Sequence, residues 1–452
     1  MMDLREAARA VEGELHGAAH RFDGVSTDSR AVGTGELFVA LEGERFDGHE
    51  YVAEAQKRGA AGALTSHLVQ TQAPMAQVVV EDTRLALGRL AAYWRGRFAL
   101  PVVALTGSNG KTTVKEMLAS ILAAHLGDRS RVLATEGNLN NDIGMPLTLL
   151  RLREEHRFAV IEMGMNHEGE IDYLTHIAQP TVAVVNNAQR AHVGILGSIE
   201  AIARAKGEIY AGLRGSGVAV VNEDDAFAGY WKGLNGAHRV VTFGLSPAAD
   251  VRAEPAGRGW LFHVPGNEFV LELLVRGEHN VRNALAACAA AAALELPADM
   301  IRAGLAEFRG VPGRLQRRRS ASGAWVIDDS YNANPESMKA AIRVLAAEPG
   351  RRVFVMGDMG ELGAGADRMH AEVGTFARES GIDALFTLGE ASRHAAQAFG
   401  AGAQPFGDVE SLIAAAGRES ASGSTLLVKG SRFMRMERVA DALAGAGGTH
   451  AL

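Results

Sequence analysis

The sequence predicts an α/β protein of three domains: a small N-terminal α/β domain (residues 1–98), a central P-loop domain with a parallel sheet (99–311) and a C-terminal Rossmann-like domain (312–452). Three observations lead to this prediction. The chain of 452 residues is too long for one ordinary core. Short apolar runs alternate with helical patterns along most of it, as in parallel sheets covered by helices. The pattern of apolar and polar residues changes near Pro101 and again at the turn-rich segment 310–313, which indicates domain boundaries at these two places.

The N-terminal segment mixes short strand-like runs with glycine-rich turns. Strands are expected at residues 37–41 and 78–80, and a helix near 51–59. The segment Gly33-Thr34-Gly35 lacks a third glycine and a preceding buried strand, so it is not a dinucleotide-binding fingerprint.

The central segment opens on a continuous apolar run at 102–106, which predicts a buried parallel strand. A glycine loop and a helical pattern at 114–126 follow. Further buried strands are expected at 158–161, 182–185 and 218–221, with a helix at 198–213. Residues 249–275 alternate in short runs typical of antiparallel hairpins, and the alanine-rich stretch 284–294 predicts a helix.

The C-terminal segment returns to the alternation of strands and helices. Strands are expected at 325–328, 353–356, 384–388 and 425–428, with helical patterns between them. This order predicts a small doubly wound sheet.

The composition, 47% hydrophobic and 22% charged residues, is typical of a soluble globular protein. The net charge of -7 argues against general nucleic-acid binding, and the basic run at 317–319 is too short to change that. The single cysteine, Cys288, excludes an internal disulfide and a cysteine-based zinc site, and is expected to be a buried helix residue. No apolar stretch reaches the ~18 residues of a membrane span, so a cytoplasmic protein is expected.

The glycine loop at 107–113 carries the strongest chemical signal. Its glycines let several N–H groups face one anion, and the start of the following helix adds a favourable dipole. Lys111 can reach the β and γ phosphates of a nucleotide, and the Thr112 hydroxyl suits Mg²⁺. Leu105 stands where the common P-loop pattern has its first glycine, so an ordinary GTPase or kinase is disfavoured.

Six motifs in the same order resemble those of the Mur ligase family, and the resemblance extends over the whole chain. They lie at residues 106–113, 161–164, 186–192, 205–208, 277–280 and 328–335. The resemblance implies an amide ligase that hydrolyses ATP to ADP and phosphate. Transfer of the γ-phosphoryl group to a carboxylate would give an acyl phosphate, which an amine then attacks.

Within the family, the segments 25–30, 46–49, 135–144 and 427–432 resemble members that add D-alanyl-D-alanine to a UDP-N-acetylmuramoyl tripeptide. The Asp-Asn-Pro-Arg/Lys sequence of the diamino-acid-adding members is absent, as is the dinucleotide-type glycine fingerprint of the muramate-alanine ligases. Family members are usually monomers, so a monomer is expected.

The resemblance also assigns roles to single residues. The expected catalytic residues are Lys111, Glu162, His192 and Lys206, and the expected ligands of two Mg²⁺ ions are Thr112, Glu162, His192 and Lys206, the last as a carbamylated lysine. ATP contacts are expected from Gly107, Ser108, Asn109, Gly110, Lys111, Thr112, Thr113, His279, Asn280, Arg314 and Asp329. Substrate contacts are expected from Ser26, Asp28, Ser29 and Arg30 for the UDP part, from Asn138, Asn140 and Asn141 for the muramoyl peptide, and from Asn332, Asn334, Asp358, Lys429, Ser431 and Arg432.

Physical arguments support some of these roles. Glu162 ends a predicted buried strand, where ligand crevices form in open α/β sheets, and a buried carboxylate needs a cation or metal partner. Arg314 and Asp329 fall in the third domain, so they would meet ATP when that domain closes and excludes water.

Two alternatives remain at this stage. One is another amide ligase of the superfamily, either the tripeptide-forming Mur enzyme or a folylpolyglutamate synthetase. The other is a nucleotide-dependent switch that binds a protein partner, which would explain the glycine loop but not the later Glu162, His192 and Lys206.

Overall fold

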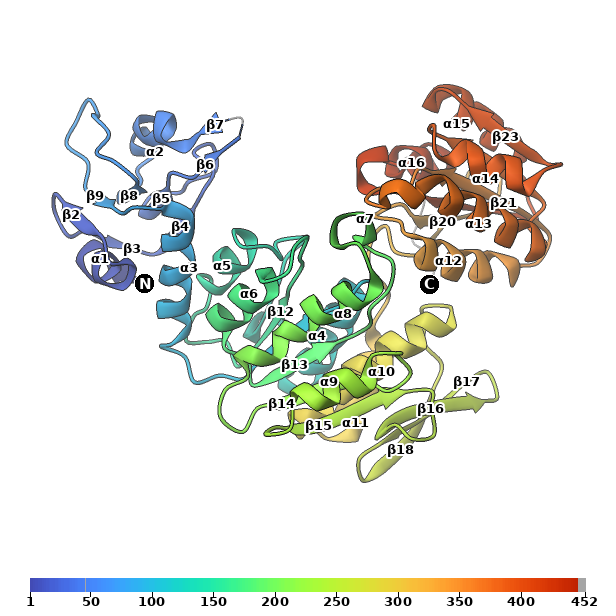
Figure 1. The fold of residues 1–452 in the computed structure, drawn as a ribbon, viewed down its shortest axis with the longest axis horizontal. Coiled ribbons are helices and arrows are strands. Elements are labelled where there is room, and N and C mark those ends of the chain that lie inside the picture. The colour runs from blue at the N-terminus through green and yellow to red at the C-terminus, as the bar shows by residue number, and fades with distance from the viewer. Residues whose placement is uncertain (45, 446–452) are drawn as a thin grey trace.

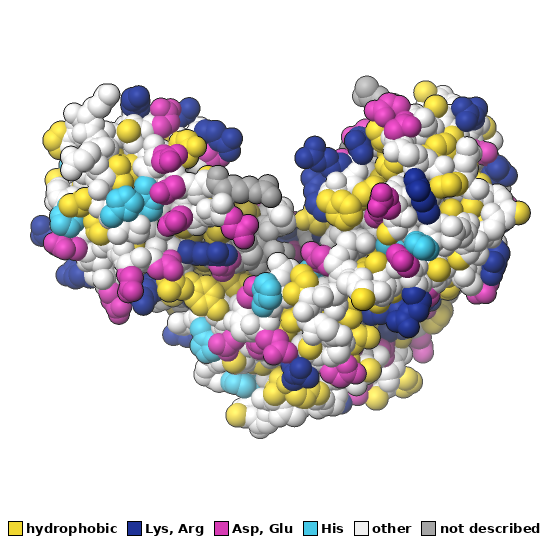
Figure 2. All heavy atoms as spheres, turned by 45° about the horizontal axis from the view of Figure 1, so that its top comes forward, with side chains coloured by type: hydrophobic (Ala, Val, Ile, Leu, Met, Phe, Trp, Pro, Cys, Tyr) yellow, Lys and Arg dark blue, Asp and Glu magenta, His cyan; other side chains and the backbone are white. Residues whose placement is uncertain are grey.

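The computed structural model describes residues 1–44 and 46–445. They form three α/β domains, with the N-terminal and C-terminal domains on either side of the central one (Figure 1). A wide hollow separates the two outer domains on the face seen in Figure 2. The predicted fold class, α/β with three domains and parallel sheets, is confirmed.

The N-terminal domain is built on a five-stranded sheet in the order β2 (Glu14–His16), β9 (Gln77–Val79), β8 (Gly62–Thr65), β5 (Glu36–Val39) and β4 (Gly24–Ser26). Two small antiparallel pairs accompany it, β1 (Met2–Asp3) with β3 (Arg21–Phe22) and β6 (Glu42–Gly43) with β7 (Phe46–Asp47). Its helices are α1 (Leu4–Val11) and α2 (Val52–Lys57), and α3 (Thr83–Arg95) leads to the central domain.

The central sheet has nine strands, in the order β11 (Val132–Ala134), β12 (Phe158–Glu162), β10 (Val102–Thr106), β13 (Val182–Val185), β14 (Val218–Asn222), β15 (Arg239–Gly244), β16 (Val251–Ala256), β17 (Gly259–Val264) and β18 (Asn267–Leu271). Neighbours are parallel from β11 to β16, and β16, β17 and β18 form the predicted antiparallel hairpins. Strands β11 and β15 were not predicted: β11 has only three residues, and the apolar pattern of β15 is interrupted by Arg239, Thr242 and Gly244.

Helices cover both faces of the central sheet. On one face lie α4 (Lys111–Leu126), α10 (Glu278–Ala293) and α11 (Ala298–Glu307), and on the other α5 (Gly144–Leu149), α6 (Glu170–Ala178) and α8 (Ile199–Gly207). Alternate residues of β10 pack into the two layers, so a short all-apolar run is what this position requires. Shorter helices are α7 (Val193–Leu196) and α9 (Ala228–Leu234).

The C-terminal sheet has the order β19 (Gln316–Arg319), β20 (Trp325–Asp329), β24 (Ser424–Lys429), β21 (Arg351–Gly357), β22 (Ala384–Leu388) and β23 (Ala403–Phe406). All neighbours are parallel except β19 and β20. The helices are α12 (Pro335–Ala346), α13 (Ala366–Glu379), α14 (Ser392–Phe399), α15 (Val409–Glu419) and α16 (Glu437–Ala444).

Two local expectations need correction. The predicted helix 198–213 is α8 followed by a 3₁₀ turn, Glu208–Gly212. The helix expected from residue 284 begins at Glu278, so it includes part of the 277–280 motif. The basic run at 317–319 lies in strand β19, where the guanidinium groups of Arg317 and Arg319 lie over the ring of Trp325.

Cys288 is buried in α10, as predicted. Within residues 1–44 and 46–445, no helix combines the length and the apolar character that a membrane span requires.

Candidate active site

The glycine loop joins β10 to α4 and is held in its phosphate-binding shape by the protein itself. Gly110 adopts a φ of 80°, and a Cβ at this position would lie 2.2 Å from Oδ1 of Asn283. Only glycine therefore fits here. The Nζ atom of Lys111 donates to the carbonyl of Gly107 at 2.8 Å, which folds the lysine back over the loop.

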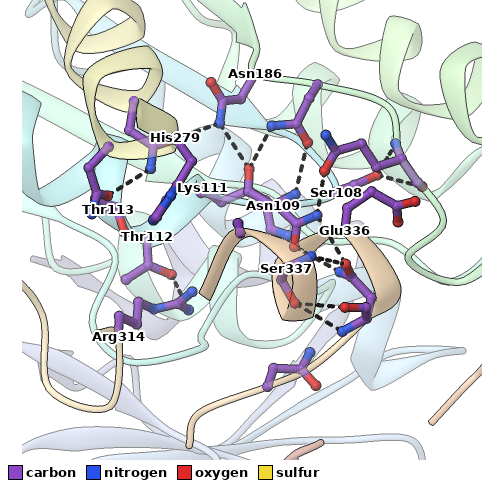
Figure 3. A pocket seen from close by; sticks show the side chains of 18 of the residues that line it. Ser108, Asn109, Lys111, Thr112, Thr113, Asn186, His279, Arg314, Glu336 and Ser337 are labelled. Atoms are coloured by element: carbon purple, nitrogen blue, oxygen red, sulfur yellow. Dashed lines mark hydrogen bonds between the residues drawn. The ribbon is translucent and has the colours of Figure 1, made fainter. Parts of the chain in front are cut away.

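Asparagine side chains hold the loop from outside (Figure 3). Asn186 and Asn187, which follow β13, both donate to the carbonyl of Asn109, at 2.9 and 3.1 Å. Asn187 also accepts from the backbone N–H of Asn109 at 2.9 Å. Asn186 donates in addition to Oδ1 of Asn283 in α10 at 3.1 Å, which links the loop to the 277–280 motif.

Asn186 and Asn187 lie in one of the motifs but have no predicted role, and no role was predicted for Asn283 or Asn222. Asn222 ends β14 and donates to the carbonyl of Asn186 at 2.8 Å. For Asn186, Asn187 and Asn222 the available signal was their position at the ends of neighbouring apolar strands, since the carboxyl ends of parallel strands meet at one edge of the sheet. Asn283 lies in α10 and carries no such signal.

Glu162 lies at the end of β12 and is 2% exposed. Its Oε2 accepts from the Thr112 hydroxyl at 2.8 Å and its Oε1 accepts from the Asn140 amide at 2.7 Å. Its backbone N–H donates to the hydroxyl of Thr135 at 2.9 Å. The carboxylate is thus fixed beside the first turn of α4.

The pair of Thr112 and Glu162 fits a Mg²⁺ ion, because a hydroxyl and a carboxylate oxygen lie together at the loop. Among the described residues, no group of three or more His, Cys, Asp and Glu side chains could hold a metal ion. That finding is compatible with Mg²⁺, which is commonly bound through one or two carboxylates together with substrate phosphates and water.

Lys206 lies in α8 and is 1% exposed. Burial lowers the pKa of its amine well below the ordinary value of 10.5, and the nearby charge of Lys111 lowers it further. None of the ion pairs in the described part of the chain includes Lys206. Burial also lowers the pKa of Lys111, although the charge of Glu162 opposes this effect.

His192 faces the C-terminal domain in this structure. Its Nδ1 lies 2.7 Å from Oε2 of Glu361, and the side chain is 21% exposed. The contact holds the pKa of the Glu361 carboxyl below its usual value. Next to it, the backbone N–H of Gly194 donates to the carbonyl of Glu361 at 2.9 Å.

Charged and amide groups join the central and C-terminal domains around the loop. Arg190 makes two 2.8 Å hydrogen bonds to the carboxylate of Glu372 and a third, of 2.5 Å, to Glu336. The hydrogen bonds from Arg190 are the main reason why the pKa of Glu372 falls to about 2, and Lys339 contributes a smaller part. Asn334, which caps α12, exchanges side-chain hydrogen bonds with Asn109.

A cavity of about 1030 Å³ lies between these two domains. It is lined by most of the predicted catalytic and nucleotide-binding residues and by part of the predicted substrate set: Ser108, Asn109, Gly110, Lys111, Thr112, Thr113, Asn140, Asn141, Glu162, His192, His279, Asn280, Arg314, Asp329, Asn332, Asn334 and Lys429. Arg314 points from the C-terminal domain toward the loop and donates to the Thr112 hydroxyl at 2.9 Å (Figure 3).

Of the two predicted adenine contacts, Asn280 is already hydrogen-bonded within the protein. The amide of Asn280 donates to the carbonyl of Arg276 at 2.8 Å and accepts from Asn283 at 3.2 Å. Burial lowers the pKa of His279 to about 4, so its ring is neutral at pH 7. On the C-terminal domain Asp329 pairs with Lys429 at 2.6 Å.

The remaining predicted residues are not part of the cavity wall: Gly107, Lys206, Ser26, Asp28, Ser29, Arg30, Asn138, Asp358, Ser431 and Arg432. Ser26 ends β4 in the N-terminal domain and residues 27–30 follow it, with Asp28 and Arg30 forming a bidentate ion pair. Asp358 accepts from the backbone N–H of Ser392 at 2.7 Å, and the Ser431 hydroxyl accepts from that of Gly360 at 2.8 Å. The side chains of Asp358 and Ser431 therefore accept hydrogen bonds from backbone N–H groups of the C-terminal domain.

All three domains match known protein families. The family models "Mur ligase family, catalytic domain", "Mur ligase middle domain" and "Mur ligase, glutamate ligase domain" match residues 21–95, 105–291 and 313–432. The UDP-N-acetylmuramoyl-tripeptide–D-alanyl-D-alanine ligase of Escherichia coli K12 is 42% identical over 97% of this chain and 98% of its own.

Solved structures agree with this result. MurF from Acinetobacter baumannii matches with a TM-score of 0.89 and 39% identity over 97% of both chains. The MurF ligase of Thermotoga maritima in complex with ADP matches with a TM-score of 0.82 and 28% identity, over 93% of this chain and 97% of that chain.

Gly110→Ala tests the shape of the loop. The added methyl group would strike Asn283, so we expect nucleotide affinity to fall about 100-fold or more through loss of several charge-assisted hydrogen bonds. Gly127→Ala is the matched control, because Gly127 ends the same helix at a φ of 66° with no atom within 4 Å of the added Cβ. It should cost ~1–2 kcal/mol of stability and leave binding intact. Equal loss of ADP binding in both variants, measured by calorimetry, would contradict this account of the loop.

Glu372→Gln tests the contact between the central and C-terminal domains. The pKa of Glu372 is about 2, below its ordinary value of 4.5, so the carboxylate stabilises domain contact above pH 4.5 and loses this effect as the pH falls toward 2. In wild type, small-angle scattering should show the radius of gyration rising below pH 4.5. In Glu372→Gln it should be larger already at pH 7. Glu419→Gln, which breaks the Arg351 pair inside the C-terminal domain, should behave as wild type. An unchanged radius in Glu372→Gln at pH 7 would refute the role.

Proposed function

Because the chain belongs to the Mur ligase family, we propose that it is the ATP-dependent ligase that joins D-alanyl-D-alanine to a UDP-N-acetylmuramoyl tripeptide. This is the reaction named for the Escherichia coli relative, which aligns over nearly the full length of both chains. The product of this reaction would be a cytoplasmic precursor of peptidoglycan. The observation that carries the proposal is the loop at 107–113 held beside Glu162 in a cavity that two domains share.

The chemistry follows from the poor reactivity of a carboxylate toward amines. Its oxygen attacks the γ-phosphorus of ATP, the bond from that phosphorus to the bridging oxygen breaks, and ADP leaves. The amine then attacks the carbonyl carbon of the acyl phosphate, loses a proton and expels phosphate. Both steps concentrate negative charge, so cations held in place lower their barriers.

The protein supplies two of these cations before any substrate binds. Lys111 and Arg314 approach the loop from the central and C-terminal domains. Thr112 and Glu162 are the residues that would hold Mg²⁺, which offsets charge on the transferring phosphate when bound. Asn140 fixes the second oxygen of Glu162, so the carboxylate keeps one orientation.

We assign binding of the UDP substrate to residues 1–98 and binding of ATP to residues 99–311. Residues 312–452 are assigned to the amine. Ser26, Asp28, Ser29 and Arg30 would hold the UDP group, and Asn138, Asn140 and Asn141 the muramoyl peptide. Asn332, Lys429 and Arg432 offer polar groups to D-alanyl-D-alanine on the C-terminal domain, and Arg432 is 63% exposed. We assign the chain as a monomer.

Lys206 is proposed to act as a carbamate. An amine without a carboxylate partner, whose pKa is lowered by burial, is the neutral nucleophile that attacks CO₂. The amine nitrogen bonds to the carbon, one proton is released, and an anionic carboxylate results. Together with His192, this group would offer a second Mg²⁺ its ligands.

Phosphate release tests the proposed reaction. With ATP, Mg²⁺ and UDP-N-acetylmuramoyl tripeptide, a coupled assay should show release that depends on added D-alanyl-D-alanine. Diaminopimelate, lysine or glutamate in its place should give none. Lys111→Ala should lower the rate by about 100-fold or more, as expected for loss of a charge that stabilises the transition state. Release that depends on one of the other amines would assign a different ligase, and release independent of every amine would indicate a nucleotide switch.

Lys206→Ala tests the carbamate. Carbon NMR in isotopically labelled bicarbonate should show a carbamate signal in wild type that is absent from Lys206→Ala, and the variant should lose about 100-fold in activity. Lys115→Met is the matched control, because Lys115 is equally buried but pairs with Glu116 at 2.8 Å. The control should retain the signal. Full activity of wild type without bicarbonate and without the signal would exclude the modification.

A further inference from the structure

Tyr331 belongs to the 328–335 motif, yet neither the predicted roles nor the proposed chemistry uses its side chain. Its ring lines the cavity at the junction of the central and C-terminal domains. The guanidinium carbon of Arg314 lies 4.3 Å from the centre of the ring, and that of Arg432 lies 5.9 Å from it. The ring thus contacts one arginine on the nucleotide side and one on the side assigned to the amine substrate.

Arg314 has few other partners. Its Nη2 donates to the Thr112 hydroxyl, while its Nε is buried and makes no hydrogen bond within the described residues. None of the ion pairs among those residues includes Arg314, and the nearby Lys111 carries the same charge. An unsatisfied, buried N–H on a cation is costly, so this guanidinium is suited to an anion in the cavity.

The backbone reinforces the contact between Arg314 and Tyr331. The N–H of Tyr331 donates to the carbonyl of Gly313 at 3.1 Å, directly before the arginine. Leu315 directly after it has a φ of 54°, and its N–H donates to Asp329 at 3.1 Å. The residues on both sides of Arg314 are therefore tied to the strand end that carries Tyr331, while the guanidinium itself is oriented by the ring and Thr112.

We propose that Tyr331 is a positioning residue, whose ring holds the guanidinium plane of Arg314 in place to receive a nucleotide phosphate across the domain junction. Stacking on an aromatic face fixes a planar guanidinium without using its N–H groups, which stay available to phosphate oxygens. The inference rests on the phosphate-binding role proposed for Arg314. It extends that role by naming the group that orients the arginine before ATP binds.

Calorimetric titration with ADP and with a methylene analogue of ATP tests this role without the acid or amine substrate. Tyr331→Leu should weaken binding of the analogue by about three- to tenfold, the range of a partly desolvated cation–π contact. Tyr331→Phe keeps the ring and should stay within about twofold of wild type. In an Arg314→Ala background, Tyr331→Leu should cause no further loss, because the two residues act through one interaction.

Trp325→Leu is the matched control. Trp325 carries two arginines over its ring, at 4.1 and 4.5 Å, in the same domain but outside the cavity wall. This variant should bind both nucleotides as wild type does.

If Tyr331→Leu does not fold, Tyr331→Met replaces it. Additive losses in the double variant, or equal losses in Tyr331→Phe and Tyr331→Leu, would overturn the role of Tyr331. Since no amine is present, a failure of D-alanyl-D-alanine-dependent phosphate release would leave this result unaffected.

Discussion

A phosphate-binding loop must turn its N–H groups toward the ligand, which leaves its carbonyl groups to be satisfied from the other side. In this protein the amides of Asn186 and Asn187 both donate to the carbonyl of Asn109, and Lys111 donates to that of Gly107. These contacts fix the curvature of the loop before ATP is present. Because the asparagines follow β13, the loop geometry depends on the register of two parallel strands in the central sheet.

The same loop is contacted by the C-terminal domain, and the result is a concentration of positive charge. Arg314 donates to the Thr112 hydroxyl, and the charge of Lys111 lies close to that of Arg314. Burial lowers the pKa of Lys111, and the charge of Arg314 lowers it further although Glu162 opposes this, which is the electrostatic cost of a site prepared for a polyanion. ATP would relieve this repulsion as it binds. A water-filled site of the same shape would have to reorient its dipoles during the reaction, whereas these cations are already in place.

How far the sequence predicts this structure depends on whether the determinants are local. Strands β10 and β13 lie at the predicted residues, since an apolar run bounded by polar residues is a local signal. The motif residues Lys111, Thr112 and Glu162 also meet as expected. The sequence does not predict that Asn283 restrains Gly110, or that His192 faces Glu361. Those contacts join residues far apart in the chain, and they depend on how the domains dock, which no local pattern encodes.

The two domain junctions differ in kind, and this difference indicates which outer domain moves. Helix α3 packs into an apolar core that continues from α1 into the central domain. There Arg95, 1% exposed, donates to the carbonyls of Ala178 and Gln179, and Trp94 donates to that of Leu152. The C-terminal junction instead consists largely of ion pairs and amide contacts such as Arg190 with Glu372. Polar contacts can exchange for water or ligand at little net cost, whereas separating an apolar core cannot. We therefore propose that the N-terminal domain is the fixed side of the site and that closure over ATP moves the C-terminal domain.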